Sequence, residues 1–199
     1  MDRADWLTAE PDVRNMALML IEQGARRALD LGCGVGRHSL LLSSLGFEVL
    51  ALDGSPAGVD YTRRVTREAG YDLDIRIGPM TDLPYEPESF DYVLAWNVIY
   101  HGDENVVRRC IEEIYRVLRP KGLFQGTMLS KRNSRYGRGR EIAPNTFIHA
   151  DESDKRHPHY YCSAKELIHL FESFEIWSLN DREHKRAGSY HWSLTAERI

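Results

Sequence analysis

Three glycines at alternate positions, Gly32, Gly34 and Gly36, follow a short run that ends at Leu31. Because glycine has no side chain, such a loop can bring the backbone close to a ligand. The dinucleotide-binding pattern G-x-G-x-x-G requires a glycine where this chain has Arg37. The triphosphate-binding pattern requires a lysine followed by Ser or Thr, and neither follows the loop. The spacing therefore matches neither phosphate-binding pattern in full.

An acidic residue follows at the distance that a nucleoside site needs. Asp53 ends the apolar run 47–53, 17 positions after Gly36. A carboxylate at the end of the second strand can accept both hydrogen bonds of a ribose diol. Folds that bind NAD share this feature, so Asp53 predicts a nucleoside without choosing between classes of enzyme.

The elements around these residues alternate between helix and strand. Apolar periodicity, prolines at first turns and glycines at ends predict helices at 11–23, 37–46, 55–70, 103–118 and 163–174. Buried runs predict strands at 26–31, 47–53, 72–78, 90–99, 123–129, 174–180 and 189–199. This order predicts an α/β fold with a doubly wound, mostly parallel sheet, helices on both faces and an antiparallel C-terminal hairpin.

The chain is expected to form a single domain over residues 1–199, with a lid-like insertion at about 131–162. Glycine, arginine, proline and histidine accumulate in this insertion, and it shows no apolar period. An irregular segment of this length in a compact domain is usually functional. His38, on the helix after the glycine loop, is expected to be buried and structural.

Composition excludes several classes of protein. A net charge of −4 disfavours a protein that binds nucleic-acid phosphates, since that class needs a basic face. Apolar runs fall short of the roughly 18 residues of a membrane span, and the first residues do not resemble a secretory signal. Cys33, Cys110 and Cys162 form no C-x-x-C pair, which indicates a cytoplasmic protein with no zinc site. Metal binding by residues 157–162 with His149 or His191 is disfavoured because the ligand spacing is loose.

The segment from Asp30 to Gly36, D-x-G-x-G-x-G, resembles the first motif of the class I S-adenosylmethionine-dependent methyltransferases. The resemblance extends over residues 28–128 and includes an M-T-D-L-P-Y turn after the third strand and an L-R-P-K-G turn after the fourth helix. It implies a Rossmann-like, seven-stranded fold and S-adenosylmethionine as cofactor. The cofactor-binding residues that it implies are Asp30, Gly32, Cys33, Gly34, Gly36, Asp53, Gly54, Thr81, Asp82, Leu83, Trp96 and Asn97. Asp30 would meet the ammonium end, Asp53 the ribose and Asp82 the adenine amine.

The acceptor side is less specific. Family members that methylate planar amines of nucleic acids or of protein glutamine often carry [DN]-P-P-[FY] after the fourth strand, where this chain has A-W-N-V-I-Y-H. This favours a small-molecule acceptor and disfavours nucleic acid. The candidate catalytic residues are His101, Tyr160 and His184, and the candidate acceptor-binding residues are Tyr100, His157, His159 and Arg186. The alternative is a packed strand end followed by a solvated loop.

The last turn weakly resembles the tellurite-resistance-type methyltransferases. His184 takes the place of a histidine that acts there on a small chalcogen oxyanion, but Lys185 stands where that branch has arginine. A guanidinium grips an oxyanion with two parallel hydrogen bonds and an ammonium does not. The substrate of that branch is therefore only one of several expectations.

Together these features predict methyl transfer to a small acceptor, with S-adenosylhomocysteine as product. A tellurite-like oxyanion, a carboxylate, a thiol and a phenol remain open as acceptors, and an anionic one is included among them. Two alternatives stay open: an NAD(P)-dependent oxidoreductase, and an S-adenosylmethionine-binding protein without catalysis. The expected assembly is a monomer or a homodimer, with no membrane partner.

Overall fold

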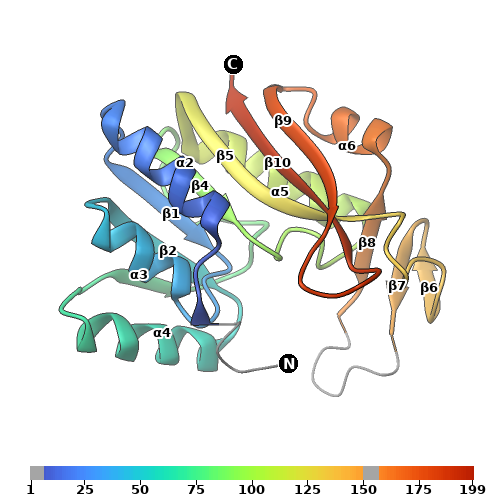
Figure 1. The fold of residues 1–199 in the computed structure, drawn as a ribbon, viewed down its shortest axis with the longest axis horizontal. Coiled ribbons are helices and arrows are strands. Elements are labelled where there is room, and N and C mark those ends of the chain that lie inside the picture. Colours follow the sequence, from blue (N-terminus) through green and yellow to red (C-terminus); the bar gives the residue numbers. More distant parts are fainter. Residues whose placement is uncertain (1–6, 150–156) are drawn as a thin grey trace.

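The computed structural model describes residues 7–149 and 157–199, in which helices and strands alternate (Figure 1). The helices are α2 (Pro11–Glu22), α3 (Arg37–Ser44), α4 (Pro56–Glu68), α5 (Glu104–Val117) and α6 (Ala164–Leu170). The strands are β1 (Arg27–Leu31), β2 (Glu48–Asp53), β3 (Asp74–Ile77), β4 (Phe90–Ala95), β5 (Leu118–Ser130), β6 (Arg140–Ala143), β7 (Thr146–Ile148), β8 (His159–Cys162), β9 (Phe174–Glu183) and β10 (Tyr190–Arg198). The predicted alternation is confirmed.

The central sheet has the order β3-β2-β1-β4-β5-β10-β9. Strands β1 to β5 run parallel to one another, whereas β10 is antiparallel to both β5 and β9. The strand order reverses beside β1, so the connections that follow β1 and β4 leave in opposite directions and a crevice forms at the carboxyl ends of these strands. This confirms the doubly wound, mostly parallel sheet with an antiparallel C-terminal hairpin.

Helices cover both faces of this sheet (Figure 1). Neighbouring residues of β1 point to opposite sides: Ala28 packs in a cluster with residues of α2 and α3, and Leu29 packs in a cluster with residues of α5 and α6. Both residues are fully buried. Burial on both faces explains why these strands read as continuous apolar runs in the sequence.

Side-chain caps fix where the helices begin. Ser55 accepts a hydrogen bond from the N–H of Gly58 at the start of α4, and Asp103 accepts one from Val106 at the start of α5. Ser163 and Glu166 form a reciprocal capping box at the start of α6. Each cap satisfies N–H groups that have no partner inside the helix.

The insertion differs from the irregular loop that the sequence predicts. Its described residues contain β6, β7 and β8, and the part at 150–156 lies outside the described residues. Leu129 of β5 pairs with Tyr161 of β8 on one edge and with His191 of β10 on the other. Because β4 ends before this point, β8 occupies the place beside β5 that β4 occupies earlier along the strand. The insertion therefore extends the sheet next to the carboxyl end of β4.

Two strand boundaries also differ from the prediction. Strand β4 ends at Ala95 and not at residue 99, because Asn97 adopts the left-handed conformation with φ 62°. Strand β5 begins at Leu118, within the predicted turn, and Lys121 takes up the turn with φ 67°. Non-glycine residues with such φ values are uncommon and interrupt regular strands.

Candidate cofactor and acceptor site

A cavity of about 710 Å³ opens at the carboxyl ends of β1 to β4. Its wall is formed by the glycine loop, by the ends of β1 and β2, by the turn after β3 and by the segment after β4. In open α/β sheets this crevice is where ligands bind. The cavity thus brings together the glycine loop and Asp53, as the sequence predicts.

The glycine loop can be built only from glycine. Gly32, Gly34 and Gly36 have φ values of 72°, 53° and 74°. A Cβ on Gly32 would lie 2.2 Å from Cγ2 of Val98, and a Cβ on Gly36 would lie 2.7 Å from Cγ2 of Thr62. A Cβ on Gly34 would meet no atom closer than 3.9 Å, because Gly34 faces the cavity. Gly34 therefore offers its backbone directly to a ligand.

Asp53 is held at the edge of the cavity by backbone donors. Its Oδ2 accepts the N–H of Gly34 at 2.8 Å, and its Oδ1 accepts the N–H of Ser55 at 2.8 Å. Thr62 donates to the carbonyl of Gly34 at 2.7 Å and fixes the loop from the other side. Each carboxylate oxygen can accept a second hydrogen bond, so Asp53 still has capacity for a diol.

Asp30 lies beneath the loop and does not line the cavity. It is 2% exposed, and its Oδ2 accepts the hydroxyl of Ser39 at 2.6 Å. Burial raises the pKa of Asp30 to about 6, although the hydrogen bond from Ser39 and the charge of Arg37 oppose this. The structure gives Asp30 a role in supporting the loop, and the expected direct contact with an ammonium group remains a prediction.

Trp96 and Asn97 follow β4 and line the cavity, as expected. The backbone N–H of Asn97 donates to Oγ1 of Thr127, and this hydroxyl donates back to Oδ1 of Asn97. Both distances are under 3.0 Å, at 2.8 and 2.9 Å. This exchange with β5 stabilises the left-handed conformation of Asn97. Cys33 and Gly54 also line the cavity.

The expected adenine turn is displaced along the chain. Pro79 and Met80 line the cavity, but Thr81, Asp82 and Leu83 do not. Leu83 is buried, and its N–H donates to Glu113 of α5. Asp82 is exposed. A direct contact of Asp82 with a ligand stays a prediction, whereas the sequence reading missed Met80 because an apolar residue carries no signal of its own.

On the acceptor side, two of the predicted histidines reach the cavity. His101 and His157 line it, and their ring centroids lie 6.2 Å apart. His159 is buried behind His101 at 5.1 Å, and Tyr100 lies 4.7 Å from His101. An isolated β-bridge joins His101 to His159. Strand β8 thus sets the position of His101.

Tyr160 lies away from the cavity. It is 1% exposed within the main core, and its hydroxyl donates to Glu104 of α5 at 3.4 Å. Burial and the charge of Glu104 raise its pKa above the ordinary value. The structure therefore places Tyr160 outside the residues that line the cavity, and a catalytic role for Tyr160 stays a prediction.

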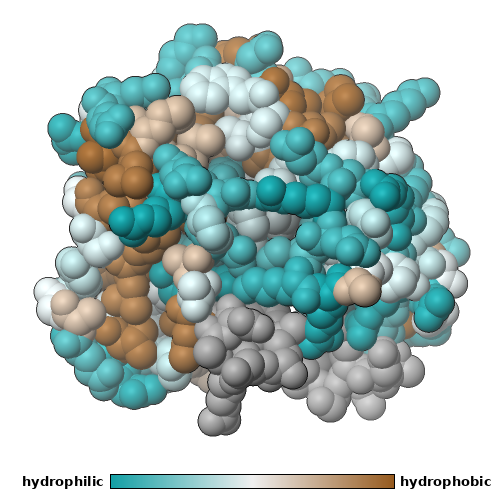
Figure 2. Space-filling model, viewed as in Figure 1, coloured by the Kyte–Doolittle hydropathy of each residue, from teal (hydrophilic) through white to brown (hydrophobic). Residues whose placement is uncertain are grey.

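His184 joins a cluster of charged residues that we name the Glu10 cluster: Glu10, Arg37, His184 and Lys185. Oε1 of Glu10 lies 3.2 Å from Arg37, 3.3 Å from Nε2 of His184 and 3.0 Å from Nζ of Lys185. The ring of His184 packs edge-on against Trp96 at 6.3 Å. Arg186 is exposed next to this cluster. The turn between β9 and β10 therefore reaches the cavity wall, and polar residues cover this part of the face (Figure 2).

Sequence reasoning missed Glu10 and gave Arg37 and His38 no binding role. Arg37 and His38 line the cavity, and Nε2 of His38 accepts the N–H of Glu10 at 3.3 Å. Burial, with the charge of Arg37, lowers the pKa of His38 to about 3, so it is neutral. Glu10 precedes Pro11 at a helix start, where an acidic residue is ordinary, so its sequence position carries no functional signal.

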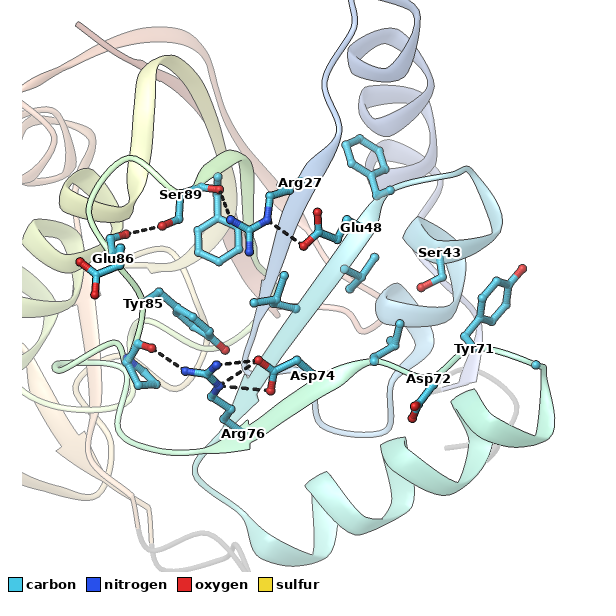
Figure 3. A pocket seen from close by; sticks show the side chains of 17 residues that line it. Arg27, Ser43, Glu48, Tyr71, Asp72, Asp74, Arg76, Tyr85, Glu86 and Ser89 are labelled. Carbon is cyan, nitrogen blue, oxygen red and sulfur yellow. Dashed lines mark hydrogen bonds and ion pairs between the residues drawn. The ribbon is translucent and has the colours of Figure 1, made fainter.

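A second groove of about 760 Å³ lies at the opposite end of the sheet, at the amino ends of the strands (Figure 3). Both arginines of this groove are paired: Arg27 with Glu48, and Arg76 with Asp74. Arg76 also donates to the carbonyl of Pro84. Because catalytic groups of such folds gather at the carboxyl ends, we assign the site to the first cavity.

Two further findings concern residues 7–149 and 157–199. Groups of three or more His, Cys, Asp or Glu placed to hold a metal ion are absent from them. Helices long and apolar enough to cross a membrane are also absent from these residues.

Known proteins show similarity to this chain in both structure and sequence. A solved S-adenosylmethionine-dependent methyltransferase from Methanosarcina mazei superposes with a TM-score of 0.80 at 20% identity, over 96% of this chain and 99% of that one. The chain therefore has the fold of that protein. Residues 28–122 match the family model described as a methyltransferase domain. Residues 28–122 are thus similar to a methyltransferase domain.

Two curated relatives show how far the similarity extends. A glycine/sarcosine/dimethylglycine N-methyltransferase from Actinopolyspora halophila is 34% identical over 128 residues, which are 61% of this chain and 22% of that protein. A ubiquinone biosynthesis O-methyltransferase from Methylocella silvestris is 34% identical over 106 residues, 53% of this chain and 40% of that protein. The chain thus spans less than half the length of these two relatives.

Proposed function

We propose that this protein transfers the methyl group of S-adenosylmethionine to a small acceptor. The observation that carries the proposal is the glycine loop, whose Gly34 faces an open cavity while Asp53 is fixed beside it. When bound, S-adenosylmethionine supplies a methyl group already activated on a sulfonium. The protein then needs mainly to hold an acceptor in line at near-attack distance.

The residues of the cavity fit this cofactor. The space beside Gly34 and Gly54 is open, because a Cβ on either would lie 3.9 Å from its nearest neighbour. A ligand can occupy this space, since neither glycine has a side chain. Asp53 would accept hydrogen bonds from the ribose, and Pro79 and Met80 would contact the base. The indole Nε1 of Trp96 is buried and has no hydrogen-bond partner among the described residues. An unpaired buried donor is costly, which supports a ligand atom beside it.

His101 and His157 are the side chains that we propose for proton handling. Both line the cavity, and an imidazole can accept a proton near neutral pH. A neutral acceptor must lose a proton as it is methylated, and an anionic acceptor does not. We propose that Tyr100 and His159 position His101 from behind.

We further propose that the acceptor is anionic. Arg37, His184 and Lys185 converge on one carboxylate oxygen beside Trp96, and such donors suit an anionic oxygen. The two relatives above act on nitrogen and on oxygen, as their names state, so similarity alone selects neither. Tellurite-like oxyanions, carboxylates, thiols and phenols all remain candidates.

Calorimetric titration with S-adenosylhomocysteine tests the cofactor, and we expect binding in the micromolar range, about −8 kcal/mol. Tight binding of NAD without binding of S-adenosylhomocysteine would favour an oxidoreductase instead. Turnover of labelled S-adenosylmethionine with a panel of thiols, phenols, carboxylates, amines and metalloid oxyanions tests catalysis. Binding without turnover of any acceptor would indicate a cofactor-binding protein.

We also propose a cytoplasmic location and a monomer or homodimer. Cys33, Cys110 and Cys162 are all free and buried, which suits a reducing compartment. Size-exclusion chromatography with light scattering tests the assembly.

A further inference from the structure

Glu10 holds the centre of a site built by three distant parts of the chain. Glu10 precedes α2, Arg37 is the first residue of α3, and His184 and Lys185 belong to the turn between β9 and β10. All three basic side chains approach the same oxygen, Oε1, within 3.3 Å. The side chains of Glu10 and Arg37 are only 12% and 8% exposed.

This site adjoins the cavity proposed for methyl transfer. Arg37, His38 and Trp96 line that cavity, and His38 accepts the backbone N–H of Glu10. Trp96 packs edge-on against both His38 and His184, at 6.2 and 6.3 Å. Trp96 is 8% exposed, and its Nε1 has no hydrogen-bond partner within residues 7–149 and 157–199. A ligand oxygen between Trp96 and the Glu10 cluster would complete the indole's hydrogen bonding.

The chemistry at Oε1 is that of an anion site already filled by a carboxylate. A guanidinium, an ammonium and an imidazole surround one oxygen, as they would around an oxyanion or a carboxylate ligand. Burial would raise the pKa of Glu10, but the hydrogen bonds from His184 and Lys185 and the charge of Arg37 lower it to about 2. Glu10 is therefore ionised throughout the neutral range and occupies the site as an anion.

We infer that Glu10 is a specificity-determining residue: its carboxylate occupies the anion position made by Arg37, His184 and Lys185, and an anionic acceptor binds by displacing it. The inference rests on the proposed function, since it takes the neighbouring cavity to be the acceptor site. A glutamate side chain can rotate out while the backbone of Glu10 stays fixed by His38. An anion with several oxygens can accept more hydrogen bonds from these three side chains than the single oxygen Oε1 does, so it competes with Glu10.

Asp12 supplies a matched control. It forms an ion pair with Arg182, which joins the same two segments of the chain two residues away from Glu10. Replacing Asp12 by asparagine removes one negative charge from the same region and leaves the carboxylate that Arg37 and Lys185 contact in place. Glu10→Gln removes one negative charge as well, and it replaces a carboxylate oxygen, which is a strong hydrogen-bond acceptor, by an amide oxygen, which is a weaker one. Any difference between the two variants is thus local to the Glu10 cluster.

Inorganic sulfate is a suitable probe because it cannot be confused with turnover. We would titrate wild type, Glu10→Gln, Asp12→Asn and the double variant Glu10→Gln/Lys185→Met with sulfate by calorimetry, without any nucleoside present. We expect Glu10→Gln to bind sulfate about tenfold more tightly than wild type, because a hydrogen bond to a charged group is released for the ligand. Asp12→Asn should change the affinity less than about twofold at the same ionic strength, and the double variant should lose the gain.

An affinity of Glu10→Gln equal to or weaker than that of wild type would overturn the inference, because Glu10 would then only position the basic side chains. An equal gain in Asp12→Asn, or a gain that survives Lys185→Met, would overturn it as well. Circular dichroism checks that every variant folds. A separate titration with S-adenosylhomocysteine distinguishes failure of the proposed function, since the sulfate comparison does not depend on the nucleoside.

Discussion

Asp53 has two roles in the cavity. It lines the wall, and it accepts hydrogen bonds from two backbone N–H groups. Replacing it by alanine removes the acceptor for a ribose and also releases Gly34 and Ser55. We expect Asp53→Ala to weaken S-adenosylhomocysteine binding by about 1–3 kcal/mol, as for a lost hydrogen-bond partner. Asp74→Ala, at the other end of the sheet, should leave binding unchanged. Calorimetry that finds equal affinities for both variants would remove Asp53 from the site.

Ser39 tests the support beneath the glycine loop. Its hydroxyl is the hydrogen-bond donor to the buried carboxyl of Asp30. Ser39→Ala would leave that carboxyl without this bond, and we expect the free energy of unfolding to fall by about 1–3 kcal/mol. Ser44 lies on the same helix with an exposed side chain bonded to the carbonyl of Leu41, so Ser44→Ala should be nearly neutral. Similar urea midpoints for the two variants would show that the Asp30 bond contributes little.

At the residue scale, sequence reasoning found the groups whose spacing carries a signal. Gly32, Cys33, Gly34, Asp53, Trp96 and Asn97 line the cavity, because the strand–loop–helix pattern fixes them relative to one another. It failed where tertiary packing decides. Glu10 reaches the site through a contact 174 positions away along the chain, and no local pattern encodes such a contact.

The glycine loop can be tested as an element through its contact with the segment after β4. Gly32→Ala combines a φ of 72° with a Cβ placed 2.2 Å from Val98, so we expect it to destabilise the fold by more than backbone strain alone, which is about 1–2 kcal/mol. Gly70 has φ 85° and open space around it, so Gly70→Ala measures the strain by itself. The measurement is the urea midpoint of each variant.

Val98 separates the two contributions. If the clash dominates, Gly32→Ala/Val98→Ala should be more stable than Gly32→Ala alone, because the shorter side chain makes room for the new methyl group. The strain contribution would remain. A double variant that is less stable than both single variants would show that Val98 does not limit the loop, and the close approach of the two segments would then need another explanation.

At the element scale, prediction succeeded where an element buries a regular stripe of residues. Helix α5 shows this: its buried residues Val107, Cys110, Ile111 and Ile114 follow the predicted helical spacing. It failed for β6, β7 and β8, which are only three or four residues long. Such short strands have too few residues to show alternation, and β8 depends on pairing with a strand about 30 positions earlier.

At the scale of the whole molecule, buried titratable groups predict how stability depends on pH. Burial lowers the pKa of His38 to about 3, and burial with the charge of His184 lowers that of His191 to about 4. Both histidines have an ordinary pKa of 6.5, so the unfolded chain binds two more protons than the folded chain near pH 5. Asp30 acts in the opposite direction, because its folded pKa of about 6 exceeds its ordinary 3.8.

Near pH 5 these three groups give the unfolded chain one more proton than the folded chain. The two histidines contribute two extra protons to the unfolded chain, and Asp30 contributes one to the folded chain. The free energy of unfolding should therefore fall by about 1.4 kcal/mol per pH unit as the pH drops through this range. Below pH 4.5 the decrease should steepen, because Glu10 and Glu166 have an ordinary pKa of 4.5 and folded pKa values of about 2, so they take up protons in the unfolded chain before they do so in the folded chain. Urea unfolding at pH 7, 6, 5 and 4 measures this slope.

His191→Asn shows which group causes the slope. Asparagine does not titrate, so the variant should lose the proton difference of His191 and flatten the curve between pH 6 and 5, where the remaining contributions of His38 and Asp30 nearly cancel. A variant curve parallel to that of the wild type would mean that His191 is protonated in the folded state. In that event the ring beside His184 would carry a charge, and the surroundings of the proposed acceptor position would be more strongly cationic than the buried, neutral histidine implies.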